Sequence, residues 1–245
     1  GRVDKQDTFL DHHALERARG ITIFSKQAVF ILGERRYTLL DTPGHVDFSA
    51  EMERTLQILD YAVLIVSGAD GVQGHTQTLW KLLKRYQIPT FVFVNKMDQK
   101  GCDKEALLQE LKHRLEEQCV DFSTDHSTES FLENIAVCEE ELLERYLEGN
   151  EVTKEDICHL IATRNVFPCY FGSALRQEGI DELLQGFLDY MVCPSYADTF
   201  AAKVFKISRD EQGNRLTWLR VTGGSLKLKA ALSNQTDDEP WEEKV

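Results

Sequence analysis

The chain has 245 residues, of which 42% are hydrophobic, enough to bury the core of one large domain or of one domain and part of a second. A formal net charge of −13 and a pI of about 5.0 argue against a broad basic surface that binds DNA or RNA through phosphates. The six cysteines form no C-x-x-C pair and no run of about 18 apolar residues occurs, so we expect reduced thiols in a soluble, cytoplasmic protein that binds neither membrane nor DNA.

Short apolar runs predict buried strands in the first part of the chain. The predicted strands are Ala28–Leu32, Tyr37–Leu40, Ala62–Val66, Phe91–Val94 and Phe167–Phe171. Gly33-Glu34 predicts a tight antiparallel hairpin between the first two strands, whereas helix-length segments separate the later strands and imply parallel crossovers. The pattern predicts an α/β fold with a doubly wound, mostly parallel sheet.

Helical patterns lie between and after these strands. The predicted helices are Val46–Leu59, Thr76–Tyr86, Lys104–Gln118, Leu132–Leu147, Lys154–Arg164 and Ile180–Tyr190. The start of the Lys154 helix is the best marked, because Thr153 is a good N-cap and Asp156 stands three residues later. Val152 is also placed to pack against Ile157.

The pattern changes near the end of the chain. Pro194 ends the α/β pattern, and from Phe200 onward alternating strands surround the turns Gly213-Asn214 and Gly223-Gly224. We therefore expect one α/β domain over residues 1–194 and the start of a β-barrel domain over residues 195–245. The second segment is too short to close a typical barrel, so we expect that domain to be incomplete.

The motif Asn95-Lys96-Met97-Asp98 directly follows a predicted strand, so its side chains emerge at the carboxyl edge of a parallel sheet, where open α/β folds bind ligands. The Asp98 carboxylate can accept two hydrogen bonds from the N1–H and 2-amino groups of guanine, a pattern that adenine does not offer. Lys96 can lay its stem along the base, and Asn95 can tie this loop to its neighbours. The motif predicts guanine binding; the alternative is a polar turn after a strand.

The motif D-T-P-G-H at residues 41–45 also follows a predicted strand. Asp41 fits a carboxylate that holds Mg²⁺ through water, and Gly44 lets a backbone N–H approach the γ-phosphate with no Cβ in the way. His45 is then placed as the catalytic residue that orients the attacking water. The alternative for His45 is a solvent-facing residue at the start of a helix.

Two weaker motifs complete the predicted site. Thr22, in R-G-I-T-I before the first strand, is placed to bind Mg²⁺ through its hydroxyl and the γ-phosphate through its backbone N–H. Ser173 and Ala174 follow the last predicted strand of the sheet, where the backbone N–H of Ala174 can meet the guanine O6. Each of these motifs gains weight only from its place beside the others.

No G-x-x-x-x-G-K-[ST] phosphate loop occurs in the sequence, so we expect a GTPase domain without its first strand and phosphate loop. That strand would lie between Tyr37–Leu40 and Ala62–Val66. Unpaired strand edges are costly, so we expect these two strands to pair with each other, to be covered by another segment, or to be displaced. The chain as printed should lack GTPase activity, since the phosphate-binding Lys is missing.

Taken in order, the segments 19–23, 41–48, 70–73, 95–98 and 172–174 resemble the GTPase domain of the elongation factor G family of translational GTPases, with the typical histidine after D-T-P-G. The short segment between Asp98 and Gly172, with Lys203–Ile207 and Leu216–Arg220, resembles the tetracycline-resistance ribosomal protection branch. The resemblance implies that the full protein binds GTP and GDP with Mg²⁺, binds the ribosome, including its RNA, and hydrolyses GTP. The alternative is a binding module that retains the motifs without turnover.

Overall fold

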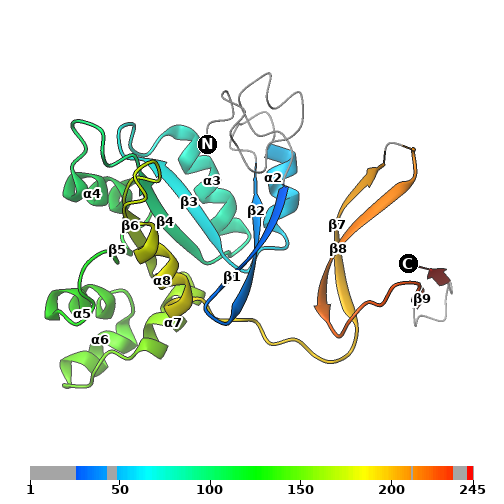
Figure 1. The fold of residues 1–245 in the computed structure, drawn as a ribbon. Helices are drawn as coiled ribbons and strands as arrows, with labels where there is room; N and C mark the ends of the chain where they lie inside the picture. The colour runs from blue at the N-terminus through cyan, green and yellow to red at the C-terminus, as the bar shows by residue number, and fades with distance from the viewer. Residues whose placement is uncertain (1–25, 43–48, 211, 234–241, 245) are drawn as a thin grey trace. The chain divides into compact units, whose positions relative to one another are not determined.

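The computed structural model describes residues 26–42, 49–210, 212–233 and 242–244. The chain divides into two compact units between Val192 and Cys193 (Figure 1). This boundary lies close to the predicted one after residue 194, whereas the assignment of the second unit to a β-barrel domain stays a prediction. Each unit is described by itself below.

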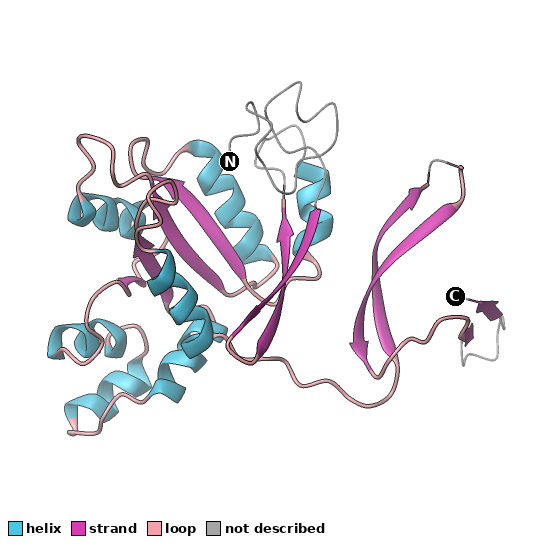
Figure 2. Ribbon diagram, in the orientation of Figure 1, coloured by secondary structure: helices cyan, strands magenta, loops and turns pink. Residues whose placement is uncertain are grey.

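The first unit contains a four-stranded parallel sheet with the strand order β3-β4-β6-β5 (Figure 2). The strands are β3 (Ala62–Ser67), β4 (Thr90–Asn95), β5 (Cys119–Asp121) and β6 (Phe167–Phe171). The three longer strands confirm the predicted ones, but β5 is not among the predictions, because three residues are too few for a recognisable apolar run. The central strands β4 and β6 are buried almost throughout, as parallel strands are when both faces are covered.

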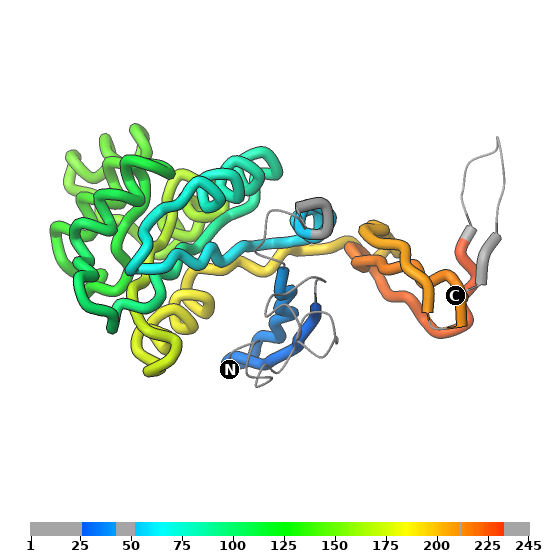
Figure 3. The backbone as a smooth tube through the Cα atoms, turned by 90° about the horizontal axis from the view of Figure 1, so that it is seen from above, coloured from blue at the N-terminus to red at the C-terminus, as the bar shows by residue number. Residues whose placement is uncertain are grey.

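Helices cover both faces of this sheet. Successive side chains of β4 point to opposite faces, so Val92 and Val94 join one buried cluster while Phe91 and Phe93 join the other. Helices α2, α3 and α4 contribute to the first cluster and α5 to α8 to the second, and Figure 3 shows α3 and α8 on opposite sides of the strands. The helices are α2 (Ser49–Leu56), α3 (Gly74–Arg85), α4 (Lys104–Arg114), α5 (Glu129–Ala136), α6 (Glu140–Leu147), α7 (Lys154–Ala162) and α8 (Ile180–Tyr190). The predicted doubly wound α/β fold is confirmed.

One predicted helix is wrong: the segment 132–147 forms two helices, not one. Helix α5 ends at Ala136, and the backbone of Glu139 is extended, with φ −146° and ψ 131°, before α6 begins. The amide of Cys138 donates to the Ile135 carbonyl in a turn between the helices. No Gly or Pro marks this break, and the helical spacing of apolar residues in the sequence continues across it. The start of α7 agrees with the prediction, because Thr153 and Asp156 form a capping box.

The strands β1 (Lys26–Leu32) and β2 (Arg35–Asp41) form the predicted antiparallel hairpin, and Gly33 takes a positive φ of +58° in its turn. The turn end lies near the end of α8, where Arg35 donates to the carbonyl of Met191, the residue that follows the helix, at 2.7 Å. In the described part of the chain the hairpin is a sheet of its own and β3 pairs only with β4. Direct pairing of the hairpin with β3, one of the three expected arrangements, is therefore excluded.

The second unit contains the antiparallel hairpin of β7 (Ala201–Arg209) and β8 (Arg215–Gly223) and the short pair β9 (Ala231–Ser233) and β10 (Glu242–Lys244). Asp210 closes the turn of the first hairpin by accepting hydrogen bonds from the backbone and the side-chain amide of Asn214 at 2.8 and 2.9 Å. These bonds hold the pKa of the Asp210 carboxyl below its usual value, with the Asn214 side chain as the first cause. The turn predicted at Gly213-Asn214 is confirmed.

Candidate functional site

The loops that follow β4 and β6 meet at the carboxyl edge of the sheet. These strands are parallel neighbours, and beyond their last paired residues the amide of Gly172 donates to the Val94 carbonyl at 2.9 Å. One residue further, the amide of Met97 donates to the Gly172 carbonyl at 3.0 Å. The backbone thus brings two predicted groups of residues together, the loop of Asn95, Lys96 and Asp98 and the loop of Ser173 and Ala174.

Asn95 joins the two loops through its side chain. Its Oδ1 accepts the backbone N–H of Lys96 at 2.8 Å and the backbone N–H of Ala174 at 2.9 Å. This contact is of the kind that was predicted for Asn95, a link between its own loop and a neighbouring one. The Ala174 amide, which was expected to meet a guanine O6, donates to Asn95 in this structure.

The backbone of Lys96 takes a left-handed conformation, with φ +65°. A residue with a Cβ adopts this conformation only where its surroundings enforce it. Its carbonyl accepts the amide of Gln99 at 3.1 Å and the thiol of Cys102 at 3.5 Å, which holds the loop in a tight turn. The Lys96 side chain is exposed, so its stem and its charge remain accessible above the loop.

Asp98 faces two residues of the other loop. The buried Ser173 hydroxyl is the first cause that lowers the pKa of the Asp98 carboxyl, and the Arg176 guanidinium adds to it through its charge. Among the described residues the Ser173 Oγ has no partner that meets the geometry of a hydrogen bond. The Ser173 hydroxyl therefore favours the charged Asp98 carboxylate as a nearby dipole. Arg176 Nε lies 3.6 Å from Asp98 Oδ2, and the Asp98 side chain is only 16% exposed. Asp98 is therefore an ionised carboxylate at ordinary pH.

The turn from Ser173 to Glu178 fixes the position of Arg176. Ser173 and Glu178 exchange both backbone hydrogen bonds, at 3.0 and 3.1 Å, and the Arg176 amide donates to the Ser173 carbonyl at 3.1 Å. Gly172 is required beside this turn, because a Cβ there would lie 2.1 Å from the Glu178 carbonyl oxygen. Arg176 was not among the predicted residues; the only signal for it in the sequence is a cation two residues after Ala174.

The remaining predicted residues are not brought to this edge by the described contacts. Asp41 is the last residue of β2 and is half-buried. In Figure 1 the carboxyl end of β2 points toward the same side of the unit as the carboxyl ends of β3 and β4. Thr22, Gly44 and His45, the predicted phosphate-binding and catalytic residues, lie outside the described residues.

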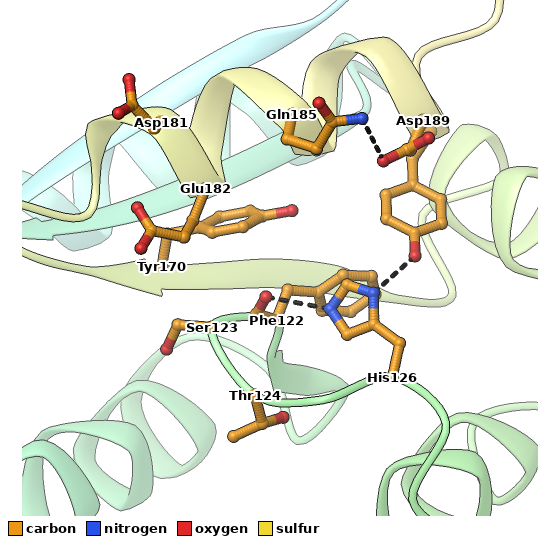
Figure 4. Close-up of a pocket in the computed structure, with 11 residues that line it drawn as sticks. Phe122, Ser123, Thr124, His126, Tyr170, Asp181, Glu182, Gln185 and Asp189 are labelled. Atoms are coloured by element: carbon orange, nitrogen blue, oxygen red, sulfur yellow. Dashed lines mark hydrogen bonds between the residues drawn. The ribbon is translucent and has the colours of Figure 1, made fainter.

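A cavity of about 440 Å³ lies elsewhere in this unit, between α8 and the loop after β5 (Figure 4). His126 is one of the residues that line this cavity. Its ring forms two hydrogen bonds, from Nε2 to the Phe122 carbonyl at 2.9 Å and between Nδ1 and the Tyr190 hydroxyl at 2.7 Å. The Tyr170 hydroxyl beside it is buried, has no hydrogen-bond partner in the described structure, and lies against Gly186 of α8. None of the predicted site residues lines this cavity.

In the part of the chain that the structure describes, no group of three or more His, Cys, Asp or Glu side chains gathers in a form that could hold a metal ion. No described helix is both long and apolar enough to cross a membrane. The two polar loops at the carboxyl edge of the sheet are thus the candidate site that both the sequence and the described contacts support.

Comparisons with known proteins show the family to which the chain belongs. Residues 1–192 match the family described as "Elongation factor Tu GTP binding domain". An oxytetracycline resistance protein of Streptomyces rimosus is 37% identical over 95% of this chain and 39% of its own length. A tetracycline resistance protein TetM of Streptococcus pneumoniae is 34% identical over 94% of this chain and 38% of its own length.

Two further similarities extend this result. Elongation factor G of Ureaplasma urealyticum is 29% identical over 94% of this chain and 43% of its own length. A crystal structure of a protein from Thermus thermophilus superimposes with a TM-score of 0.82 over the whole of this chain and 46% of its own, at 26% identity. The chain therefore spans about two fifths of the length of the curated relatives it matches.

Proposed function

The chain belongs to the family of elongation factor Tu GTP-binding domains, and from this premise we propose that the whole protein is a translational GTPase that binds and hydrolyses GTP on the ribosome. One observation carries the proposal: the Asn95 side chain joins the loops after β4 and β6 and so places Asp98 beside Ser173. A binding module without hydrolysis is the weaker alternative, since the similar proteins are resistance proteins and elongation factors.

Guanine recognition is assigned to the two joined loops. Asp98 accepts the N1–H and 2-amino groups of the base, and a carboxylate with a lowered pKa is charged and ready to do so. The buried Ser173 hydroxyl favours the charged form of Asp98, while the exposed Lys96 lays its stem along the base. The Ala174 amide reaches the guanine O6 by exchanging its present partner, Asn95. A purine without this donor pattern leaves the charged Asp98 unpaired, which selects GTP and GDP against ATP.

Binding of the phosphates of the nucleotide is assigned to Asp41 and to Thr22, Gly44 and His45, which lie outside the described residues. Gly44 and Thr22 donate backbone N–H groups to the γ-phosphate, and His45 orients the attacking water. Mg²⁺, when bound, offsets the phosphate charge, and Thr22 and Asp41 would hold it. A single half-buried carboxylate at the end of β2 fits this ion, because Mg²⁺ in nucleotide sites uses one or two carboxylates together with waters and phosphate oxygens.

The biological setting is assigned from the similar proteins. Two of them are named for resistance to tetracyclines and one is an elongation factor G. We place this protein in the ribosomal protection branch, where GTP hydrolysis follows binding to the ribosome and its RNA. Its place of action is then the cytoplasm, with neither DNA nor a membrane as partner.

Competition binding on the full-length protein tests the proposal. Labelled GDP should be displaced by unlabelled GTP at equal concentration but not by ATP. Asp98→Asn should weaken GDP binding by about 10²-fold or more, because the amide cannot accept both donors of the base and presents an N–H to one of them. The exposed Lys100→Ala, in the same loop, is the control and should bind GDP within about twofold of the wild type, since it removes only a general attraction for the negatively charged ligand. Displacement by ATP, or an unchanged affinity of Asp98→Asn, would refute the assignment.

A further inference from the structure

We propose that Arg176 is an internal competitor of the nucleotide base: its guanidinium occupies the side of the Asp98 carboxylate that guanine must use. The supporting contact is between Arg176 Nε and Asp98 Oδ2, 3.6 Å apart. This inference rests on the proposed binding of guanine by Asp98 and goes beyond it, because it assigns a control of access to that site.

The chemistry of the two groups makes them interchangeable partners for a carboxylate. A guanidinium presents N–H donors in one plane, spaced to meet the two oxygens of a carboxylate. The N1–H and 2-amino groups of guanine present the same kind of planar donor pair. Lone pairs of Asp98 that face the Arg176 guanidinium are not available to the base, so the arginine must leave before guanine binds.

The backbone places Arg176 within reach of Asp98. The turn between Ser173 and Glu178 is closed by reciprocal backbone hydrogen bonds, and Gln177 takes a positive φ of +60° immediately after Arg176. The same turn carries the Ala174 amide, which donates to Asn95. Both groups that are proposed to recognise the base, the Ala174 amide and the Asp98 carboxylate, are thus paired within the protein, and guanine replaces both internal partners at once.

The strength of the contact sets the size of the effect. The Nε–Oδ2 distance is beyond hydrogen-bond range, and the Arg176 side chain is 58% exposed, so the pair is a weak surface ion pair. Exposed ion pairs change equilibria by only about 1.5- to 5-fold. Arg176 therefore slows the entry of the base rather than blocking it, and its removal should increase the association rate and leave the dissociation rate unchanged.

Stopped-flow binding of a fluorescent N-methylanthraniloyl derivative of GDP to the full-length protein tests this inference. We compare the wild type with Arg176→Ala, with Arg176→Gln, which keeps much of the length of the side chain, and with Lys100→Ala. The lysine variant removes a like charge from the opposite loop and so measures the general loss of attraction for a negatively charged ligand. Both arginine variants should associate about two- to fivefold faster than Lys100→Ala, with equal dissociation rates.

The possible results separate the two claims. Association at the rate of Lys100→Ala overturns the competitor role while GDP binding stands. Faster dissociation from both arginine variants also overturns it, because Arg176 would then contact the bound nucleotide. If the wild-type protein binds no GDP derivative at all, the proposed function fails, and the role of Arg176 fails with it.

Discussion

The side chain of Asn95 accepts the backbone N–H of Ala174 at 2.9 Å, across 79 residues of sequence. The same oxygen accepts the Lys96 amide at 2.8 Å. One side chain thus holds two loops that come from neighbouring strands of the sheet. This contact adds to the backbone bond from the Met97 amide to the Gly172 carbonyl, which holds Asp98 and Ser173 near each other beyond the paired part of the strands.

Asn95→Ala should weaken GDP binding by about fivefold in the full-length protein, because the hydrogen bond from the Lys96 amide, worth about 1 kcal/mol, would be lost from the loop that carries Asp98. Isothermal titration calorimetry gives the affinity, and hydrogen exchange of the Ala174 amide gives the local cause, since that amide should exchange faster. Asn134→Ala, in α5, also removes an exposed side-chain hydrogen bond and serves as the control. An unchanged affinity together with faster exchange would show that the loops bind guanine without being joined.

His45→Ala should lower ribosome-stimulated GTP hydrolysis by about 10²-fold or more while GDP binding stays within about twofold of the wild type. The reason is that a residue that orients the attacking water acts on turnover and makes little contact with the bound base. Rates of phosphate release with and without ribosomes measure the first effect, and equilibrium titration measures the second. Turnover within about twofold of the wild type would make His45 a solvent-facing residue at the start of a helix.

Asp156 should make the stability of the first unit depend on pH in the acid range. The Arg145 guanidinium, 3.0 Å away, is the first cause that lowers the pKa of Asp156 to about 2, and bonds from Thr153 contribute. Because the folded-state pKa lies below the unfolded value of about 4, this contribution is present above pH 4 and is lost as the pH falls toward 2.

Asp156→Asn measures this contribution. The variant should lower the free energy of unfolding at pH 7 by about 1 kcal/mol, in the range found for weakened helix caps. The difference between the two proteins in urea unfolding should shrink as the pH falls from about 4 to about 2. An equal difference at both ends of this range would mean that the charge of Asp156 does not contribute to stability.

Gly186→Ala should destabilise the first unit although alanine is the better helix former. A Cβ at this position would lie 1.9 Å from the Tyr170 hydroxyl oxygen, so α8 or the ring must move, at a cost of about 1–3 kcal/mol. Tyr170→Phe alone should change stability by less than about 1 kcal/mol, because the hydroxyl has no hydrogen-bond partner among the described residues. Burial also raises the pKa of Tyr170, which keeps the ring neutral.

The double variant Gly186→Ala with Tyr170→Phe should recover part of the stability lost in Gly186→Ala, because the atom nearest the new Cβ is gone. Thermal unfolding of all four proteins completes this cycle. Gly74→Ala is the control, since nothing lies within 4 Å of a Cβ at that position. Additive effects in the cycle would mean that the helix, and not the ring, moves to accept the methyl group.

The sequence predicted those parts of the candidate site whose position follows from strand ends. Asn95 and Asp98 follow a continuous apolar run, and such runs in an α/β pattern place the next polar residues at the ligand-binding edge. Arg176 could not be predicted in this way, because its contact with Asp98 depends on a turn closed by backbone bonds between Ser173 and Glu178. The break near Val137 was missed for a related reason, since it is made by backbone angles and no breaker residue signals it.

The alternation of side chains along β4 has a consequence for how substitutions combine. Leu111 of α4 and Leu160 of α7 are both fully buried, but they belong to clusters on opposite faces of the sheet, so a layer of strands separates them. The loss of stability in the double variant Leu111→Ala with Leu160→Ala should equal the sum of the two single losses to within about 0.5 kcal/mol, as it does for distant sites without shared partners. Leu160 and Ile135 share one cluster, so the cavity left by one truncation changes the packing around the other and their losses should depart from the sum. The sheet thus divides the unit into two layers that tolerate substitution independently.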